Sequence, residues 1–305
     1  MKILLQALGY GALTLGLVVS LSLGYSSYVA NSGEKSEVLQ DIKYIEVSKE
    51  KIAYREAGEG NSEALVLVHG FLGSSYDYSR IIPSLAERYH IIAPDLIGFG
   101  FSTKNIKLDY SKKSLSEFVY LTLKELGIEK FNILGHSMGG EVAINLVLNH
   151  PKSVNKLILI DSGGYIQNER RLLSNEFIGS LYLRTVFQNY LLQRSIFKLA
   201  FYDRESVEIS DFKPAYSLVY NIPSKTLYKF NSDDDSGSIA NEIKTIKTPT
   251  LIIWGDKDQL IDIEHAKRFN KALLGSQLVI IKNSGHIPYI EKPNETLKAI
   301  YEFLD

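Results

Sequence analysis

The sequence has no cysteine among its 305 residues. This absence excludes disulfide bonds, thiolate metal sites, a cysteine nucleophile and a lipoprotein anchor. The charges nearly cancel, since 34 Lys and Arg residues face 35 Asp and Glu residues and the formal net charge is −1. A chain so close to neutral gives no reason to expect a nucleic-acid partner. It also shows no low-complexity tract and no repeat of fixed period.

One long apolar run stands near the start of the chain. It extends from Ile3 to about Tyr25 with Gln6 as its only strongly polar residue, which is enough for a membrane-spanning helix of roughly 20 residues. A cleaved signal peptide is the second interpretation, although a clean small-x-small end is missing, and a buried core helix is the third. The first two make the protein membrane-anchored or exported, with the rest of the chain outside the cytosol. We therefore set residues 1–30 apart as a hydrophobic anchor or signal segment, through which the membrane would be a partner.

From Asp41 onward the sequence alternates between strand-like and helix-like segments. Two segments, 43–47 and 51–58, alternate like antiparallel strands. Short continuous runs of Val, Ile and Leu are typical of strands buried in a parallel sheet, and they occupy 64–70, 90–95, 130–136, 155–161, 248–256 and 276–283. Helix-length segments lie between most of them, at Tyr76–Arg88, Leu115–Leu126, Met138–Asn149, Glu264–Leu273 and Glu291–Leu304. This order predicts an α/β fold with a mostly parallel, doubly wound sheet.

A gap of about 85 residues separates the sixth strand from the seventh. A structureless loop of that length is implausible in a compact domain, and residues 175–203 are rich in aromatic and aliphatic side chains. We therefore predict a helical cap at 165–246, inserted into a core formed by 41–164 and 247–305. Near the end of the cap, "NSDDDSG" (231–237) is expected to be an exposed turn. The cap begins at the carboxyl edge of the sheet, where ligands bind in such folds, so it can cover a site there.

The stretch "GHSMGG" places Ser137 between glycines, after a strand-like run and before a helical one. That strand–turn–helix setting is what a G-x-S-x-G nucleophile elbow requires, because the tight turn strains the serine and exposes its Oγ. A Cβ at Gly135 or Gly139 would collide with the neighbouring strand or helix. The plainer interpretation is a Gly-rich turn in which Ser137 only caps the helix.

The chain from about Asp41 to Asp305 resembles an α/β-hydrolase with a helical cap between strands six and seven, of the esterase and lipase type. Five motifs carry this resemblance in the family's order: "VHGFLGSS", "PDLIGFGFS", "GHSMGG", "IIWGDKDQLI" and "NSGHIPYIEKP". The resemblance implies that the base is His286, in the loop after the last strand. His136 adjoins Ser137, but consecutive side chains in a sharp turn diverge, so it is expected to be part of the elbow scaffold.

The same resemblance places the acid of the triad at Asp258, in the turn after strand seven. The acid would accept a hydrogen bond from the histidine and stabilise its charged form. Asp256 in the same turn and Asp161 after strand six remain alternatives, and Asp256 is expected rather to brace the turn.

The oxyanion hole is expected to use the backbone N–H groups of Met138 and Phe71. The second of these rests on the match to "HGF", in which His69 and Gly70 precede Phe71 and His69 makes a structural hydrogen bond. Asp95 begins the family's "D-x-x-G-x-G" turn, which we interpret as a structural turn that shapes the wall of the cleft.

This set of residues predicts a serine hydrolase that cleaves carboxylic esters through an acyl-enzyme, without a metal or cofactor. The Leu-, Phe- and Tyr-rich cap favours an apolar acyl group or a lipid-like ester. A carbon–carbon bond hydrolase stays an alternative, although Ile287 stands where those enzymes usually have Trp; so do a haloperoxidase, an acyltransferase and a thioesterase. A further alternative is a non-catalytic, ligand-sensing member of the family, and the aromatic cap could also be a surface for docking another protein.

Overall fold

The computed structural model describes residues 20–32, 41–165, 175–205 and 209–305. Within them lies one eight-stranded sheet in the order β1-β2-β4-β3-β5-β6-β7-β8. The first two pairings, β1 with β2 and β2 with β4, are antiparallel, and the others are parallel. The predicted fold class is confirmed. The strands are β1 (Ile42–Val47), β2 (Glu50–Ala57), β3 (Ala64–Val68), β4 (His90–Pro94), β5 (Phe131–His136), β6 (Val154–Ile160), β7 (Thr250–Gly255) and β8 (Gln277–Ile281).

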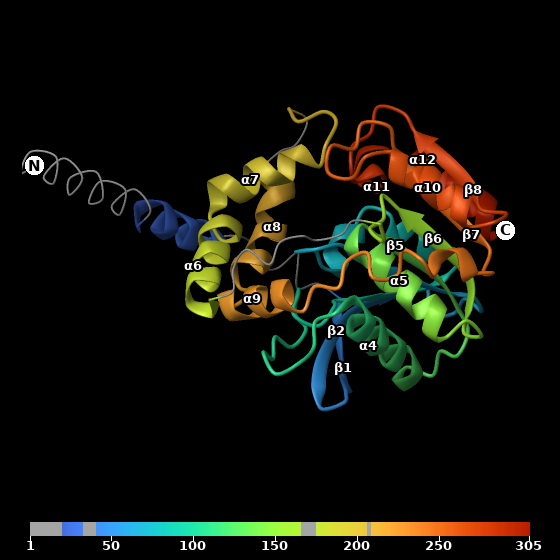
Figure 1. The fold of residues 1–305 in the computed structure, drawn as a ribbon, viewed down its shortest axis with the longest axis horizontal. Helices are drawn as coiled ribbons and strands as arrows, with labels where there is room; N and C mark the ends of the chain where they lie inside the picture. Colours follow the sequence, from blue (N-terminus) through green and yellow to red (C-terminus); the bar gives the residue numbers. More distant parts are fainter. Residues whose placement is uncertain (1–19, 33–40, 166–174, 206–208) are drawn as a thin grey trace, which may run out of the picture.

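Helices cover both faces of this sheet (Figure 1). Strand β3 shows why both faces are apolar, since Val66 and Val68 pack into one core while Leu65 and Leu67 pack into the other. The first core also contains buried residues of α4 (Lys112–Glu125), α5 (Met138–Asn149) and α10 (Glu264–Ala272). The second contains buried residues of α3 (Ile82–Ala86) and α12 (Pro293–Leu304).

One predicted helix is divided in the structure, and another begins two residues later than predicted. The segment Tyr76–Arg88 forms a 3-10 turn, η1 (Ser75–Tyr78), and then α3. Ser74 and Asp77 build a capping box around η1, and a proline at the start of α3 fixes where that helix begins. The last helix is preceded by the short α11 (Pro288–Glu291), and another proline starts α12. Prolines thus set boundaries that the apolar pattern had hidden.

The cap consists of α6 (Glu176–Phe187), α7 (Tyr190–Leu199), α8 (Ile209–Tyr220) and α9 (Ser224–Ser232), followed by the 3-10 turn η2 (Ile243–Thr245). Figure 1 shows these four helices grouped beside one edge of the sheet. The chain breaks between α6 and α7 because the side chain of Asn189 accepts hydrogen bonds from the N–H groups of Leu191 and Leu192 and so caps α7.

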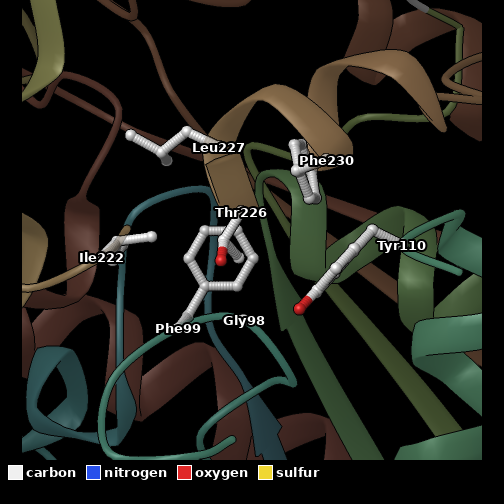
Figure 2. A pocket seen from close by; sticks show the side chains of 7 residues that line it. All are labelled: Gly98, Phe99, Tyr110, Ile222, Thr226, Leu227 and Phe230. Carbon is white, nitrogen blue, oxygen red and sulfur yellow. The ribbon is translucent and has the colours of Figure 1, made fainter. Parts of the chain in front are cut away.

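Aromatic side chains join the cap to the core. Figure 2 shows Phe99 and Tyr110 of the core facing Leu227 and Phe230 of α9. The rings of Phe99 and Phe230 meet edge to face, with centroids 5.3 Å apart. Gly98 lets its turn lie close to the Tyr110 ring, since it has φ +92° and an added Cβ would lie 2.6 Å from that ring.

The expectation that residues 231–237 form an exposed turn was wrong. Asp234 pairs with the Nζ of Lys112, a buried residue at the start of α4, and the side chain of Asp234 is only 8% exposed. Asp235 Oδ1 accepts a hydrogen bond of 2.7 Å from the N–H of Lys112. The aspartates therefore bind the N-terminus of α4, where negative charge is favoured, and hold the end of the cap to the core.

The apolar run at the start of the chain is described only from residue 20. Residues 20–32 form a helix that lies against the cap (Figure 1). Its Val29 and Ala30 are buried in one cluster with Phe212 and Tyr216 of α8. Ser26 Oγ accepts a hydrogen bond of 2.9 Å from the N–H of Tyr190 in α7. The described end of the segment that the sequence set apart, residues 20–30, is thus packed on the cap.

None of the helices in the described ranges is both long and apolar enough to span a bilayer. Residues 1–19, which hold most of the apolar run, lie outside those ranges, so the anchor and signal interpretations stay predictions.

Candidate active site

Ser137 occupies the sharp turn from β5 into α5. Its φ of 54° and ψ of −122° are strained for a residue with a Cβ, and such a conformation costs about 1–3 kcal/mol. Three backbone hydrogen bonds hold it, because Ser137 donates to the carbonyl of Ile160 at 3.0 Å and its own carbonyl accepts from Gly140 and Gly163. The side chain faces a cavity below the cap.

The two glycines of the elbow have no room for a side chain. A Cβ at Gly135 would lie 2.3 Å from the carbonyl oxygen of Gly139, and one at Gly139 would lie 2.2 Å from the carbonyl oxygen of Val68. Both neighbours are backbone atoms, so relief would require β3 or α5 to move. Close backbone packing therefore fixes where Ser137 points.

Replacing Gly139 with alanine is expected to lower the free energy of unfolding by about 3 kcal/mol or more, because the methyl group would overlap β3. Chemical denaturation of purified protein measures this loss. Gly60→Ala is the matched control, since no atom lies within 4 Å of its added Cβ. Equal stability of the two variants would contradict the close packing described above.

His286 and Asp258 meet beside Ser137. The Nδ1 of His286 lies 2.7 Å from Asp258 Oδ2, and Asp258 Oδ1 accepts from the N–H groups of Leu260 and Ile261 at 2.7 and 3.1 Å. Burial disfavours the charged carboxylate, but the hydrogen bond from His286, its charge and the two backbone donors outweigh burial and hold the pKa of Asp258 below its ordinary value. This arrangement keeps Asp258 ionised and orients the imidazole.

Ser137 and His286 line the same cavity. Across the described residues, Ser137 Oγ has no hydrogen bond to His286. Such contacts are often long without substrate and tighten when it binds. The geometry therefore brings together the three predicted residues, Ser137, Asp258 and His286, with the acid–base contact already formed.

Asp161, one of the alternative acids, lies behind this pair. One oxygen of Asp161, one of Asp258 and a ring nitrogen of His286 all lie within 4.8 Å of one another. Asp161 Oδ1 accepts from the N–H of Gly255 at 3.0 Å, while its buried Oδ2 has no hydrogen-bond partner among the described residues. Burial first, and then the charge of Asp258, raise the pKa of Asp161 well above its ordinary value. A protonated Asp161 would satisfy Oδ2 by donating a hydrogen bond to Asp258.

The other alternative, Asp256, has a different task. Its Oδ1 accepts a hydrogen bond of 2.8 Å from the N–H of Asn283, which joins the turn after β7 to the loop after β8. This contact braces the loops that carry Asp258 and His286.

Asp161, Asp258 and His286 are also the one group of His, Asp and Glu side chains in the described ranges that is spaced like metal ligands. The atoms that would bind an ion, Asp258 Oδ2 and His286 Nδ1, already bind each other at 2.7 Å. Two of the atoms that could bind an ion therefore already form a hydrogen bond with each other.

His136 bridges the elbow and the loop of the base. Its Nε2 lies 2.8 Å from the carbonyl oxygen of His286, and its Nδ1 lies 3.2 Å from the Tyr289 hydroxyl. Burial, and next the charge of His286, lower the pKa of His136 to about 3. A neutral ring that donates from Nε2 and accepts at Nδ1 satisfies both contacts. The sequence indicated a scaffold residue, but its partner 150 positions away was not foreseen.

His286 is also attached to the cap. The N–H of His286 donates to the carbonyl of Ala200, at the end of α7, over 2.7 Å. The next part of the cap is held as well, since the N–H of Tyr202 donates to Glu291 Oε1 over 2.8 Å. The position of His286 therefore depends on the cap as well as on the core.

The candidate oxyanion groups flank Ser137. Met138 is the first residue of α5, so its N–H has no acceptor within the helix. On the other side, a Cβ added to Gly70 would lie 3.1 Å from Ser137 Cβ, which places the loop of Phe71 against Ser137. His69 is fully buried, and this loop is fixed by its ring, which donates from Nδ1 to Gly70 O at 2.8 Å and accepts at Nε2 from the N–H of Leu96 at 2.9 Å.

Asp95 stabilises the next loop along the sheet edge. Its carboxylate accepts from the N–H groups of Ser75 and Phe101, both at 2.7 Å. Gly100 makes this possible, since it has φ +49° and an added Cβ would lie 2.1 Å from Asp95 Oδ2. Asp95 therefore shapes the wall of the cleft, and its contacts are to the backbone.

A cavity of about 960 Å³ connects Ser137 to the cap. Its cap wall is mostly apolar and includes Phe187, Ile196, Phe197, Phe212, Ala215 and Val219. The predicted insertion thus covers the candidate site, and it supplies an apolar space of the size of a small-molecule pocket.

Residues 63–293 match the family model described as alpha/beta hydrolase fold. The chain belongs to this family. This α/β-hydrolase is 30% identical to Lipase 1 of Psychrobacter immobilis over 264 residues, which are 82% of this chain and 79% of that lipase. It is 26% identical to Lipase 3 of Moraxella sp. (strain TA144), over 99% of this chain and 98% of that one. The crystal structure of a membrane phospholipase A, described as a bacterial virulence factor, superimposes with a TM-score of 0.74 and 26% identity, over 100% of this chain and 98% of that chain.

Proposed function

We propose that this α/β-hydrolase cleaves carboxylic esters with an apolar acyl chain, and that Ser137, His286 and Asp258 form its catalytic triad. The observation that carries the proposal is the strained Ser137, which shares a cavity with an imidazole held by an ionised, buried carboxylate. An ester-hydrolysing enzyme is also supported by the family and by the relatives named as lipases.

In the proposed reaction, His286 Nε2 removes the proton from Ser137 as Oγ attacks the ester carbonyl. The carbonyl oxygen becomes negative and accepts hydrogen bonds from the N–H groups of Met138 and Phe71. The bond to the alcohol then breaks, and His286 gives its proton to the leaving oxygen. Water attacks the acyl-enzyme in the same way, which releases the acid and restores Ser137. Asp258 stays ionised throughout and stabilises the charged imidazole.

The walls of the cavity support an apolar acyl group. Aliphatic and aromatic side chains of α7 and α8 form most of its cap side, and burying each methylene of an acyl chain there contributes about 0.8 kcal/mol. The names of the relatives, lipase and membrane phospholipase A, agree with a lipid ester as substrate.

A series of p-nitrophenyl esters from acetate to palmitate tests the acyl specificity. We expect kcat/KM to rise from the acetate to a chain of medium length or longer. Ala215→Phe would fill part of the cavity wall and is expected to lower kcat/KM for the longest hydrolysed chain by tenfold or more, about 1.4 kcal/mol, while acetate is cleaved at nearly the normal rate.

The same preparation should react with a fluorophosphonate probe, and peptide mass spectrometry should find the label on Ser137. A correctly folded protein that neither takes up the probe nor cleaves any ester would contradict the proposal and favour a ligand-sensing function. A flat response to chain length, with the label on Ser137, would contradict only the apolar acyl specificity.

A further inference from the structure

Large apolar side chains are exposed mainly on one part of the molecule. Of the exposed large hydrophobic residues in the described ranges, most belong to the helix 20–32, to α6 and to the segment from α7 to Tyr202. The hydrolase core contributes only scattered ones, such as Tyr44 and Leu274. Single exposed apolar residues are ordinary on a protein surface, whereas a cluster of this kind indicates an interaction site.

The spacing within each helix makes these residues continuous stripes. In α6, Phe177, Ile178, Leu181 and Tyr182 lie on one face over two turns, and Phe177 is 78% exposed. The helix 20–32 presents Leu21, Tyr25 and Tyr28 at the same kind of spacing, and α7 presents Leu191, Leu192 and Leu199. We call these three stripes together the apolar face of the cap.

Specific contacts hold the stripes in fixed relation to one another. Ser22 Oγ accepts a hydrogen bond of 2.6 Å from Asn189, the residue between α6 and α7, and the rings of Tyr25 and Tyr190 pack edge to face at 5.7 Å. Figure 1 shows the helix 20–32 beside α6 and α7 at one end of the molecule. The three stripes therefore lie next to one another on one surface.

We propose that the apolar face of the cap docks on a lipid bilayer, with its side chains entering the interfacial layer. Its sequence context favours lipid over a second protein copy, because the exposed stripe of the helix 20–32 continues an apolar run that begins at Ile3. The charges agree, since α6 and α7 carry Arg184, Arg194 and Lys198 against the single acid Glu176. Basic residues beside apolar ones suit anionic lipid headgroups.

Docking in this way would put the substrate cavity next to its lipid. The inner side of α7 lines the cavity with Ile196, Phe197 and Ala200, while its outer side carries the exposed leucines. A lipid ester would then reach Ser137 across the thickness of the cap without passing through bulk water. This consequence rests on the proposed function, whereas the docking itself does not.

The absence of cysteine makes a direct test simple. In the full chain carrying Ser137→Ala, so that vesicle lipids stay intact, a single cysteine is introduced as Phe177→Cys, Leu181→Cys or Leu192→Cys and labelled with NBD. Lys298→Cys on α12 is the control, since that side chain is 74% exposed on the core. The proteins are mixed with vesicles of phosphatidylcholine and phosphatidylglycerol. We expect NBD on the apolar face to shift to the blue and to be quenched at least twofold by doxyl-labelled lipid, with no change at the control site.

Suppose that the protein binds the vesicles and floats with them, yet NBD on the apolar face shows neither the blue shift nor the quenching, as at the control site. That result would overturn the proposal. A blue shift that needs no lipid, rises with protein concentration and resists doxyl quenching would overturn it in favour of contact between two copies of the chain. These readouts are independent of catalysis, so they stand even if the proposed function fails.

An activity measurement adds a second arm with Ser137 intact. The double variant Phe177→Gln, Leu181→Gln is expected to cleave a vesicle-embedded ester about tenfold more slowly than the native chain, while it hydrolyses p-nitrophenyl acetate in solution at the same rate. Equal rates on the embedded ester would count against the docking, and no activity on either substrate in the native chain would count against the proposed function alone.

Discussion

Replacing Ser137 with alanine is expected to lower kcat for p-nitrophenyl butyrate about ten-thousand-fold or more, because Ser137 is the residue that forms the acyl-enzyme in the proposed mechanism. The fold should persist, since the serine is held by its backbone hydrogen bonds and its hydroxyl is dispensable to them. Steady-state assays of purified protein measure the loss. The far-UV circular dichroism and melting temperature of the variant should match those of the native chain.

Ser116→Ala is the matched control for this result. Ser116 is fully buried, and its Oγ donates a hydrogen bond to the carbonyl of Lys113 within α4, away from the cavity. We expect its activity to stay within about twofold of the native value. Substantial hydrolysis by Ser137→Ala, free of contaminating esterase, would remove Ser137 from the proposed mechanism.

The second large effect separates two neighbouring carboxyl groups. Asp258→Asn is expected to lower kcat by about a thousandfold to ten-thousandfold, because an amide cannot stabilise the charged His286 and favours the wrong imidazole tautomer. Asp161→Asn should lower kcat by less than about fivefold, since the pKa of Asp161 is raised and an amide resembles the protonated acid. Kinetics at pH 8 on the two purified variants give this comparison.

A reversed order, with Asp161→Asn the more damaging, would make Asp161 the acid of the triad. Asp161→Leu provides a further control, because it removes the acceptor for Gly255 and the group that would donate to Asp258 when Asp161 is protonated. It is expected to be less stable than Asp161→Asn by about 1–3 kcal/mol, the cost of leaving buried polar groups without partners. The asparagine variant should recover that stability.

Much of the core could be predicted from the sequence because its signals are local. The runs 64–68 and 157–160 are continuously apolar, as is typical of strands covered on both faces. Helix α5 matches its expected range, Met138–Asn149, because the Gly-rich elbow fixes where it starts. Ser137 was predictable for the same reason, since strand, serine and helix are adjacent in the chain.

Other features depend on contacts between distant segments, which no short pattern records. The bond from His136 to the carbonyl of His286 spans 150 positions, and the position of Asp161 behind Asp258 follows from how β6 and β7 pair. Residues 231–237 have the composition of a surface turn, but their aspartates bind Lys112 and the N-terminus of α4, which buries them in part. A pattern can show that a residue is polar, but its partner appears only in three dimensions.

The bond from His286 N–H to the carbonyl of Ala200 ties the proposed general base to the end of α7. If the cap lifted at this end to admit an ester, it would pull on the backbone of His286, the residue proposed to activate Ser137. Substrate entry and catalysis would then require different positions of the cap, and the enzyme would hydrolyse its substrate only with the cap closed on the core. Substrates that leave α7 in place would be favoured, so the mechanical connection between cap and base could select among esters before any side chain in the cavity does.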